Sequence, residues 1–330
     1  MKATAIAPAN IAFIKYWGKK DDVLRLPLNS SISMNLSGAT TTTTVEFSKN
    51  FKADEVTIID GNFSEKEELR VIKGLDLIRK SANSSWKAKV ATKNTFPKGA
   101  GSAASASGFA ALTVAGFSAA SAADVSLSEK DLTIIARQGS GSACRSIPDG
   151  FVIWEKGDSS ENSYAHSLFP ASHWDLRDIL VIVDSSMKKV STTDGMKGVE
   201  TSPFLRERLR SIPKRLEEAK KALIEKNMKL LGKVMEEDCL DMHHVMQTQI
   251  PPLFYWNDTT KKVMESVVSW REEDGISVYF TIDAGPNVHL ICEAIDENRV
   301  LEKVKKLQGI ESFIINHPSS GAHLINTHLF

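Results

Sequence analysis

Several short stretches of the sequence hold residues whose side chains could carry out polar chemistry. Asp283 ends an apolar run in TIDAGPN, Arg145 lies in GSGSACRS, and Asn10 and Lys15 stand on either side of the apolar run in NIAFIKYWGKKD. A carboxylate can orient or deprotonate a hydroxyl, a planar guanidinium can bind a carboxylate through two hydrogen bonds, and an ammonium can stabilise developing charge. Together these groups would suit an enzyme that acts on a small anionic substrate.

A glycine-rich stretch, PKGAGSAASASG, occupies residues 97–108. It follows a predicted strand and opens a predicted helix, the setting in which backbone N–H groups and a helix N-terminus hold phosphate. The predicted nucleotide-binding residues are Pro97, Gly99, Ala100, Gly101, Ser102, Ala103, Ser105 and Ser107. A dinucleotide-binding loop and a plain turn are the alternatives. A second helix follows residues 102–123, where a dinucleotide fold would need a second parallel strand.

Composition narrows the class of protein. The chain has 330 residues, 41 of them basic and 41 acidic, and it shows no basic tail or stripe that would predict nucleic-acid binding. Its three cysteines lack CxxC spacing, which favours a reducing, cytoplasmic compartment. Residues 102–123 carry no charge, but alanine and serine dominate them, so we expect a helix buried against a sheet and no membrane span. We expect the apolar N-terminal residues to form part of the fold and not a signal peptide.

The elements that must position these residues follow from hydrophobic periodicity and turn signals. In the first half, strands are predicted over 31–38, 41–48, 55–60, 86–96, 151–157 and 176–186, with a helix over 64–82. Ser126 and Glu129 predict a capping box for a helix that runs to about residue 137. The second half predicts long helices within 194–247, a helix over 257–273, a hairpin over 276–294, a helix over 296–307 and a strand over 313–316. The fold class is therefore α+β, with predicted domains over 1–180 and 181–330.

The motifs NIAFIKYWGK, LPLNSSIS (26–33), GSGSACRS, PPLFYWND and DAGPN occur in this order along nearly the whole chain. In this respect the sequence resembles the mevalonate diphosphate decarboxylase family, within the GHMP kinase superfamily. The resemblance implies a GHMP-kinase-like two-domain fold, with an N-terminal domain like ribosomal protein S5 and a C-terminal ferredoxin-like domain. It also implies an enzyme of the mevalonate pathway of isoprenoid biosynthesis, a cytoplasmic homodimer that uses ATP and Mg²⁺.

The family uses ATP to phosphorylate the tertiary 3-hydroxyl of a 5-phosphorylated mevalonate, and phosphate and carbon dioxide then leave to give an isopentenyl product. By resemblance, Asp283 lies at the 3-hydroxyl as base or orienting group, and Arg145 binds the substrate carboxylate. Lys15 supplies positive charge near the reacting centre, with Asn10 as its hydrogen-bond partner. The residues implied in binding the rest of the substrate are Tyr16, Trp17, Lys19, Arg70, Ser140, Ser142 and Thr192.

Some alternatives stay open at this point. A 5-monophosphate fits the sequence about as well as a 5-diphosphate, because changes from the family pattern lie near the substrate region. A kinase that stops after phosphorylation is a second candidate, and a non-catalytic sensor of small molecules is a third. Cys239 and His243 in DCLDMHH have helical i,i+4 spacing, but a structural helix with one histidine on the substrate side is favoured over a metal site. Magnesium is implied by ATP and not by any ligand cluster.

Overall fold

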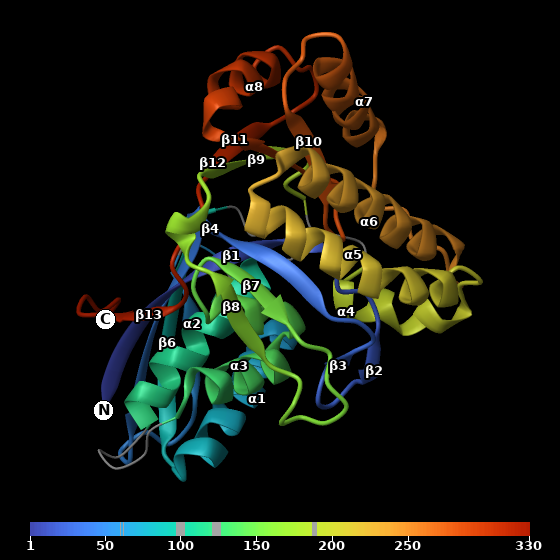
Figure 1. Ribbon diagram of the computed structural model, residues 1–330. Helices are drawn as coiled ribbons and strands as arrows, with labels where there is room; N and C mark the ends of the chain where they lie inside the picture. The colour runs from blue at the N-terminus through green and yellow to red at the C-terminus, as the bar shows by residue number, and fades with distance from the viewer. Residues whose placement is uncertain (60, 62, 97–102, 121–126, 187–189) are drawn as a thin grey trace.

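Two long antiparallel strands, β1 (Lys2–Ile14) and β4 (Ser31–Ser48), form the centre of the first sheet in the computed structural model (Figure 1). The structure describes residues 1–330 apart from 60, 62, 97–102, 121–126 and 187–189. The sheet order is β13-β1-β4-β6-β5, with β7 beside β4 and β8 beside β7. The other strands of this sheet are β5 (Glu55–Ile58), β6 (Lys87–Asn94), β7 (Phe151–Trp154), β8 (Ala165–Phe169) and β13 (His323–Ile325). A separate ribbon pairs β2 (Lys19–Asp21) with β3 (Leu26–Pro27).

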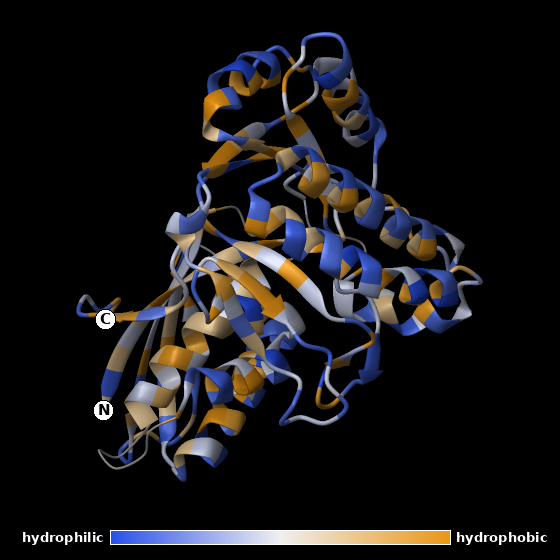
Figure 2. Cartoon of the chain, in the orientation of Figure 1, coloured by the Kyte–Doolittle hydropathy of each residue, from blue (hydrophilic) through white to orange (hydrophobic). Residues whose placement is uncertain are grey.

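Helices α1 (Glu65–Ala82), α2 (Ala103–Ala120) and α3 (Glu129–Gly139) pack with one another and with the first sheet in a shared apolar core. The alanine-rich helix α2 is apolar along its described length, as Figure 2 shows. Small residues let it approach its neighbours: a Cβ on Gly116 would come within 2.7 Å of the Ile78 side chain. The predicted buried helix is thus confirmed. No helix among the described residues has the length and apolar character needed to cross a bilayer.

The second sheet has the antiparallel order β10-β11-β9-β12. Its strands are β9 (Leu176–Ile182), β10 (Val278–Ile282), β11 (Val288–Glu293) and β12 (Ser312–Asn316). Alternate residues of β9 pack on opposite sides, as the period of two in a strand requires. Ile179 and Val181 contact a core that includes α7 (Asp258–Glu272) and α8 (Glu297–Val304), whereas Leu180 and Ile182 face the first domain.

The remaining helices and 3₁₀ turns connect these layers. The long helices α5 (Leu205–Glu225) and α6 (Met228–Thr248) lie between the second sheet and the first domain (Figure 1). The short elements are η1 (Gly141–Ser146), η2 (Ala171–His173), α4 (Thr192–Gly195), η3 (Met196–Thr201) and η4 (Ala294–Asp296). The predicted α+β class, hairpin and late helices are confirmed. The predicted domain boundary at 180/181 falls within β9 and stays a prediction, and β13 returns the C-terminal segment to the first sheet.

The prediction of separate strands over 31–38 and 41–48 was wrong, because β4 is continuous from Ser31 to Ser48. Gly38 marks no turn: its N–H donates to Asn316 Oδ1 at 3.0 Å, and a Cβ there would come within 2.7 Å of the Ile315 carbonyl oxygen. The register with β1 shifts between Pro8 and Ala9, which accommodates the irregularity without ending the strand.

This register shift also changes which face of β1 the odd-numbered residues occupy. Ala5 and Ala7 pack in the core under α2, whereas Ile11 and Phe13 pack in the core between the domains. Asn10 consequently faces η1, where its side-chain amide donates to the Ser142 carbonyl and to Ser146 Oγ. The irregularity in the register therefore determines the direction of the side chains in the last part of β1, just before Lys15.

The predicted capping box of Ser126 and Glu129 was also wrong. Helix α3 begins at Glu129 and its N-cap is Ser128, whose side chain accepts a hydrogen bond from the Asp131 N–H in a reciprocal box. Leu127 and Leu132, just before the cap and in the first turn, pack against the same core cluster, an arrangement typical of a hydrophobic staple. The pair that caps the helix is therefore Ser128 and Asp131, which has the same spacing as the predicted pair and lies two residues further along the chain.

Candidate active site

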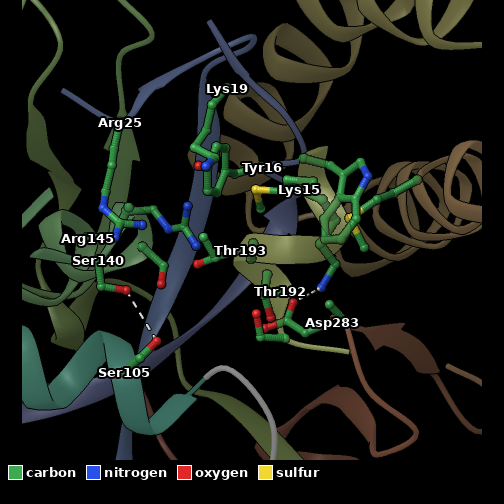
Figure 3. A pocket seen from close by; sticks show the side chains of 18 of the residues that line it. Lys15, Tyr16, Lys19, Arg25, Ser105, Ser140, Arg145, Thr192, Thr193 and Asp283 are labelled. Atoms are coloured by element: carbon green, nitrogen blue, oxygen red, sulfur yellow. Dashed lines mark hydrogen bonds and ion pairs between the residues drawn. The ribbon is translucent and has the colours of Figure 1, made fainter. Parts of the chain in front are cut away.

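A cavity of about 280 Å³ opens between the two domains and collects most of the predicted site residues (Figure 3). The predicted residues that line it are Lys15, Tyr16, Trp17, Lys19, Arg70, Ser105, Ser140, Ser142, Arg145, Thr192 and Asp283. Among the described residues, five lysine and arginine side chains and two carboxylates line the cavity, so its field favours an anionic ligand.

Lys15 and Asp283 form an ion pair across the domain boundary. Lys15 follows the end of β1, Asp283 follows the end of β10, and Lys15 Nζ lies 2.7 Å from Asp283 Oδ1. Burial alone would raise the pKa of Asp283, but the Lys15 ammonium, with His289 and Arg145, lowers the pKa of this carboxyl well below its usual range. Asp283 is therefore a carboxylate at any working pH, held ready to accept a hydrogen bond.

The backbone of Lys15 is fixed by two side chains of the second domain, Asp238 and Arg208, and by Asn29 of the first domain. Its N–H donates to Asp238 Oδ2 at 2.7 Å, and its carbonyl oxygen accepts from Arg208 Nη2 at 3.3 Å and from Asn29 Nδ2 at 2.9 Å. Arg208 and Asp238 are fully buried, and both terminal nitrogens of the guanidinium donate to the Asp238 carboxylate. The α5–α6 layer therefore sets the position of Lys15 relative to Asp283.

Arg145 lies in η1, and two hydrogen bonds to side chains of the first sheet fix the orientation of its guanidinium. Its Nε donates to Asn10 Oδ1 at 3.1 Å, and its Nη1 donates to Ser31 Oγ at 2.7 Å. The side chain is buried yet lines the cavity. Asn10, predicted as a partner of Lys15, does not line the cavity and contacts Arg145 instead. The structure therefore makes Asn10 a positioning residue for Arg145.

The KYW segment supplies one wall. Tyr16 packs edge-on against Trp154, with ring centroids 4.7 Å apart, and burial raises the pKa of its phenol. Trp17 is buried among Met196, Met242 and other apolar side chains and still lines the cavity. Lys19 forms an ion pair with the exposed Asp22, which lowers the pKa of that carboxyl. This wall thus combines hydrogen-bond donors with an apolar backing.

The predicted phosphate loop falls mostly outside the described residues, since Pro97, Gly99, Ala100, Gly101 and Ser102 belong to 97–102. Ala103 is the first residue of α2. Ser105 Oγ lies 3.2 Å from Ser140 Oγ, whereas Ser107 is buried away from the cavity and bonds to Thr41 Oγ1 at 2.6 Å. Of the predicted nucleotide-binding residues that the structure describes, Ser105 is the one that lines the cavity.

A second cavity of about 200 Å³ adjoins the first and shares Glu67, Arg70 and Ser105 with it. Apolar side chains of β5, α1 and α2 dominate its lining, with threonines and an asparagine among them: Thr41, Thr43, Val56, Ile58, Phe63, Val71, Val90, Thr92, Asn94, Ala104, Gly108, Phe109 and Leu112 complete the set. An apolar slot beside a polar, cationic cavity is a suitable shape for a nucleoside attached to phosphates.

The DCLDMHH segment forms part of α6, and two of its side chains bind the backbone at the end of β10. Cys239 Sγ accepts from the Ile282 N–H at 3.2 Å, and His243 Nε2 lies 3.4 Å from the Ile282 carbonyl oxygen. Burial lowers the pKa of His243 to about 3, so the ring is neutral and donates to that carbonyl. Met242, and not a histidine, faces the cavity. Within the described ranges, no group of three His, Cys, Asp or Glu side chains could hold a metal ion.

Sequence reasoning missed several lining residues, namely Ala12, Arg25, Glu67, Gly141, Ser191, Thr193, Met196, Met242 and Ala284. Gly141 lies within the motif GSGSACRS and Ala284 within DAGPN, and Ser191 and Thr193 flank the predicted Thr192, so each stands inside a motif or beside a predicted residue. Arg25 stands in no such motif. It reaches the cavity from the turn between β2 and β3, in a left-handed backbone conformation with φ 51° that the sequence did not signal.

Comparisons with known proteins agree with this arrangement. A family model described as the diphosphomevalonate decarboxylase-like N-terminal domain matches residues 7–165, and one described as the mevalonate 5-diphosphate decarboxylase C-terminal domain matches residues 179–323. The diphosphomevalonate decarboxylase of Saccharomyces cerevisiae is 36% identical over 93% of this chain and 82% of its own length. The Homo sapiens enzyme is 37% identical over 86% of this chain and 75% of its own length.

Solved structures give the same result. The mevalonate diphosphate decarboxylase of Staphylococcus aureus has a TM-score of 0.92 and 39% identity, covering 98% of both chains. A structure of MDDEF in complex with MVAPP, AMPPCP and magnesium has a TM-score of 0.90 and 37% identity, covering 99% of both chains. These matches confirm the GHMP-kinase-like α+β fold and the predicted enzyme class, an ATP-dependent decarboxylase. The chain belongs to the diphosphomevalonate decarboxylase family.

Proposed function

We propose that this protein catalyses the ATP-dependent decarboxylation of mevalonate 5-diphosphate to isopentenyl diphosphate. The observation that carries the proposal is the Lys15–Asp283 ion pair, which lines one cationic cavity together with Arg145. Such a cavity provides a hydrogen-bond acceptor for a hydroxyl, a guanidinium for a carboxylate and further cations for phosphate. These are the three functional groups that the substrate carries.

Bond changes in the reaction proceed in a fixed order. The 3-hydroxyl oxygen attacks the γ-phosphorus of ATP, the bond from that phosphorus to the bridging β,γ-oxygen breaks, ADP leaves with the bonding electrons, and the hydroxyl proton is released to solvent. The C3–O bond then breaks, with inorganic phosphate leaving together with the bonding electrons. The bond between C2 and the carboxylate carbon breaks next, its electrons form the C2–C3 double bond, and carbon dioxide departs. Phosphorylation is needed because hydroxide is a poor leaving group and phosphate a good one.

Asp283 acts in this scheme mainly by orientation. Its low pKa makes it a weak general base, because proton-transfer efficiency is greatest for a group whose pKa lies near the working pH. Accepting a hydrogen bond from the 3-hydroxyl aligns that oxygen with the γ-phosphate, and Lys15 beside it stabilises negative charge in transfer. Arg145 holds the substrate carboxylate until the electrons of its bond to C2 are released.

The nucleotide is proposed to enter beside α2. The apolar second cavity would receive the nucleoside, and Ser105, which lines both cavities, would contact the phosphates together with the predicted loop 97–102. Magnesium would arrive on the ATP phosphates and neutralise part of their charge. A cytoplasmic homodimer completes the proposal. The cytoplasm is supported by three cysteines that are all free and buried, and the homodimer by the family resemblance.

The test is an assay of product balance. The protein is incubated with Mg-ATP and separately with mevalonate, its 5-phosphate and its 5-diphosphate, and ADP, free phosphate and carbon dioxide are measured. We expect all three products in equal amounts from the 5-diphosphate. ADP without carbon dioxide would show a kinase, and turnover of the 5-monophosphate in preference to the 5-diphosphate would contradict the substrate assignment.

A further inference from the structure

We propose that Arg25, acting with Arg70, binds the terminal phosphate of the substrate and determines the preference for a 5-diphosphate over a 5-monophosphate. The inference rests on the proposed function and extends it to a residue outside the motifs of the chain. Figure 3 shows Arg25 on the Ser140 side of the cavity, across from Asp283. A diphosphate on C5 would point toward this end when the 3-hydroxyl lies at Asp283.

The two arginines come from different elements but are held at one place. Arg25 lies in the turn between β2 and β3, and its Nε donates to the Gln138 carbonyl oxygen at 2.8 Å. Arg70 lies on α1, and its Nη2 donates to the Gly139 carbonyl oxygen at 3.4 Å. These carbonyls are consecutive and belong to the last turn of α3, so the two guanidinium groups are neighbours.

The end of α3 explains how two like charges can be placed together. Unpaired carbonyls give a helix C-terminus partial negative charge, which favours cations there. The Phe109 ring supports Arg70 further, with the guanidinium carbon 5.1 Å from the ring centroid. Two effects lower the pKa of Arg70: burial of the guanidinium, which is the larger, and repulsion by the nearby charge of Arg25. A bound anion between the two groups would relieve this repulsion.

Free donors remain on both side chains. Arg25 uses its Nε for Gln138, and neither of its terminal NH₂ groups has a hydrogen-bond partner among the described residues. Arg70 Nε is buried and also lacks a partner. Within the same part of the chain, neither arginine forms a salt bridge with a carboxylate. Several unused donors on two neighbouring guanidiniums suit the three oxygens of a terminal phosphate.

The backbone at Arg25 adds a constraint on its role. Its φ of 51° is a conformation that a side chain with a Cβ seldom adopts. Val23, two residues earlier in the turn, is 82% exposed, whereas Leu26, the next residue, is buried. The arginine side chain nevertheless turns inward and lines the cavity. A half-buried turn residue whose side chain lines the cavity is well placed to act on the ligand.

The test compares two ligands by titration calorimetry without ATP, with mevalonate 5-diphosphate and mevalonate 5-phosphate as probes. We expect Arg25→Met to raise the Kd of the 5-diphosphate by about 10- to 100-fold, since a hydrogen bond between charged groups is lost. The Kd of the 5-phosphate should change by less than about twofold. Arg25→Lys should fall between, because an ammonium keeps the charge and loses the fork of donors.

Lys20→Met is the matched control. Lys20 lies on the same ribbon, is exposed in an ion pair with Asp158 and does not line the cavity, so both Kd values should stay unchanged. Equal weakening of both ligands in Arg25→Met, or no weakening, would overturn the inference. If Arg25→Met melts early, the ratio of the two Kd values in Arg25→Lys decides in the same way. Loss of selectivity in a protein that releases no carbon dioxide would refute the proposed function alone.

Discussion

Asp238 has two roles, because it positions the backbone of Lys15 and stabilises the fold through a buried ion pair. Replacing it by asparagine, with a matched control, should distinguish the effect on catalysis from the effect on stability. The Asp238 carboxylate is fully buried and accepts hydrogen bonds from Lys15 N–H, Arg208 and Arg215. Asparagine has nearly the same shape, but one oxygen becomes an NH₂ group that must face a donor. The buried cluster of two arginines and two aspartates also loses one negative charge.

The size of both effects follows from these contacts. Breaking a buried ion pair by removing one partner costs about 3–5 kcal/mol of folding free energy. Asp241 remains beside both arginines, so we expect a loss near the lower end, about 3 kcal/mol. For catalysis, a shift of the Lys15 backbone by about 1 Å would lengthen the 2.7 Å contact to Asp283, and misplacement of that size can lower the rate about 100-fold.

The assay is steady-state decarboxylation at a temperature where melting curves show the variant to be folded. We expect kcat of Asp238→Asn to fall by about 10- to 100-fold while KM for ATP changes little. Asp241→Asn is the control, because it removes the same charge from the same arginines without touching Lys15. It should lower the melting temperature and keep kcat near the parent value. An equal fall of kcat in both variants, or a folded Asp238→Asn protein with full kcat, would refute the positioning role.

Two further perturbations test the electrostatics. Lys15→Met removes the largest influence that lowers the pKa of Asp283, whereas burial still raises this pKa and His289 and Arg145 still lower it. The pKa of Asp283 should therefore rise, and residual kcat/KM should fall more steeply toward pH 4 than in the parent; an unchanged pH profile would contradict the pairing. His243 has a folded-state pKa of about 3, below the value of about 6.5 in an unfolded chain, so its contribution to stability is lost as pH falls below about 6.5, by up to about 1.4 kcal/mol per pH unit. The drop in melting temperature between pH 7 and pH 5 should therefore be smaller in His243→Gln than in the parent, and an unchanged drop would refute the neutral buried ring.

Local sequence signals predicted most elements well because those signals act over a few residues. The alternation in residues 86–96 and the alanine-rich run after 102 gave β6 and α2. The two errors have the same origin. Gly38 and Ser126 each carried a plausible local signal, for a turn and for a cap. The contacts of Asn316 with Gly38 and the packing of Leu127 and Leu132 favoured different local structures.

The candidate site divides in a similar way. Motifs predicted Lys15, Arg145 and Asp283, and the structure brings all three to one cavity. No motif predicted the contact of Asp238 with Lys15, because the two residues are 223 positions apart and the bond involves a backbone N–H. Arg25 was missed for a different reason. Its direction depends on a left-handed backbone angle, which is unusual for arginine and leaves no pattern in the sequence.

Apolar burial and polar contacts contribute differently to the geometry of this site. The core between the domains, which includes Ile11, Phe13, Leu180 and Ile182, holds the two sheets together, but apolar burial is non-directional and tolerates small shifts. The 2.7 Å contact between Lys15 and Asp283 needs placement to a fraction of an ångström. The two residues follow strands of different domains, so the packing of either domain alone does not set this distance. Directional hydrogen bonds supply that precision: Asp238 and Arg208 hold Lys15, while Cys239 and His243 hold Ile282, the residue before Asp283. Because Asp238, Cys239 and His243 all belong to α6, one helix sets both ends of the pair.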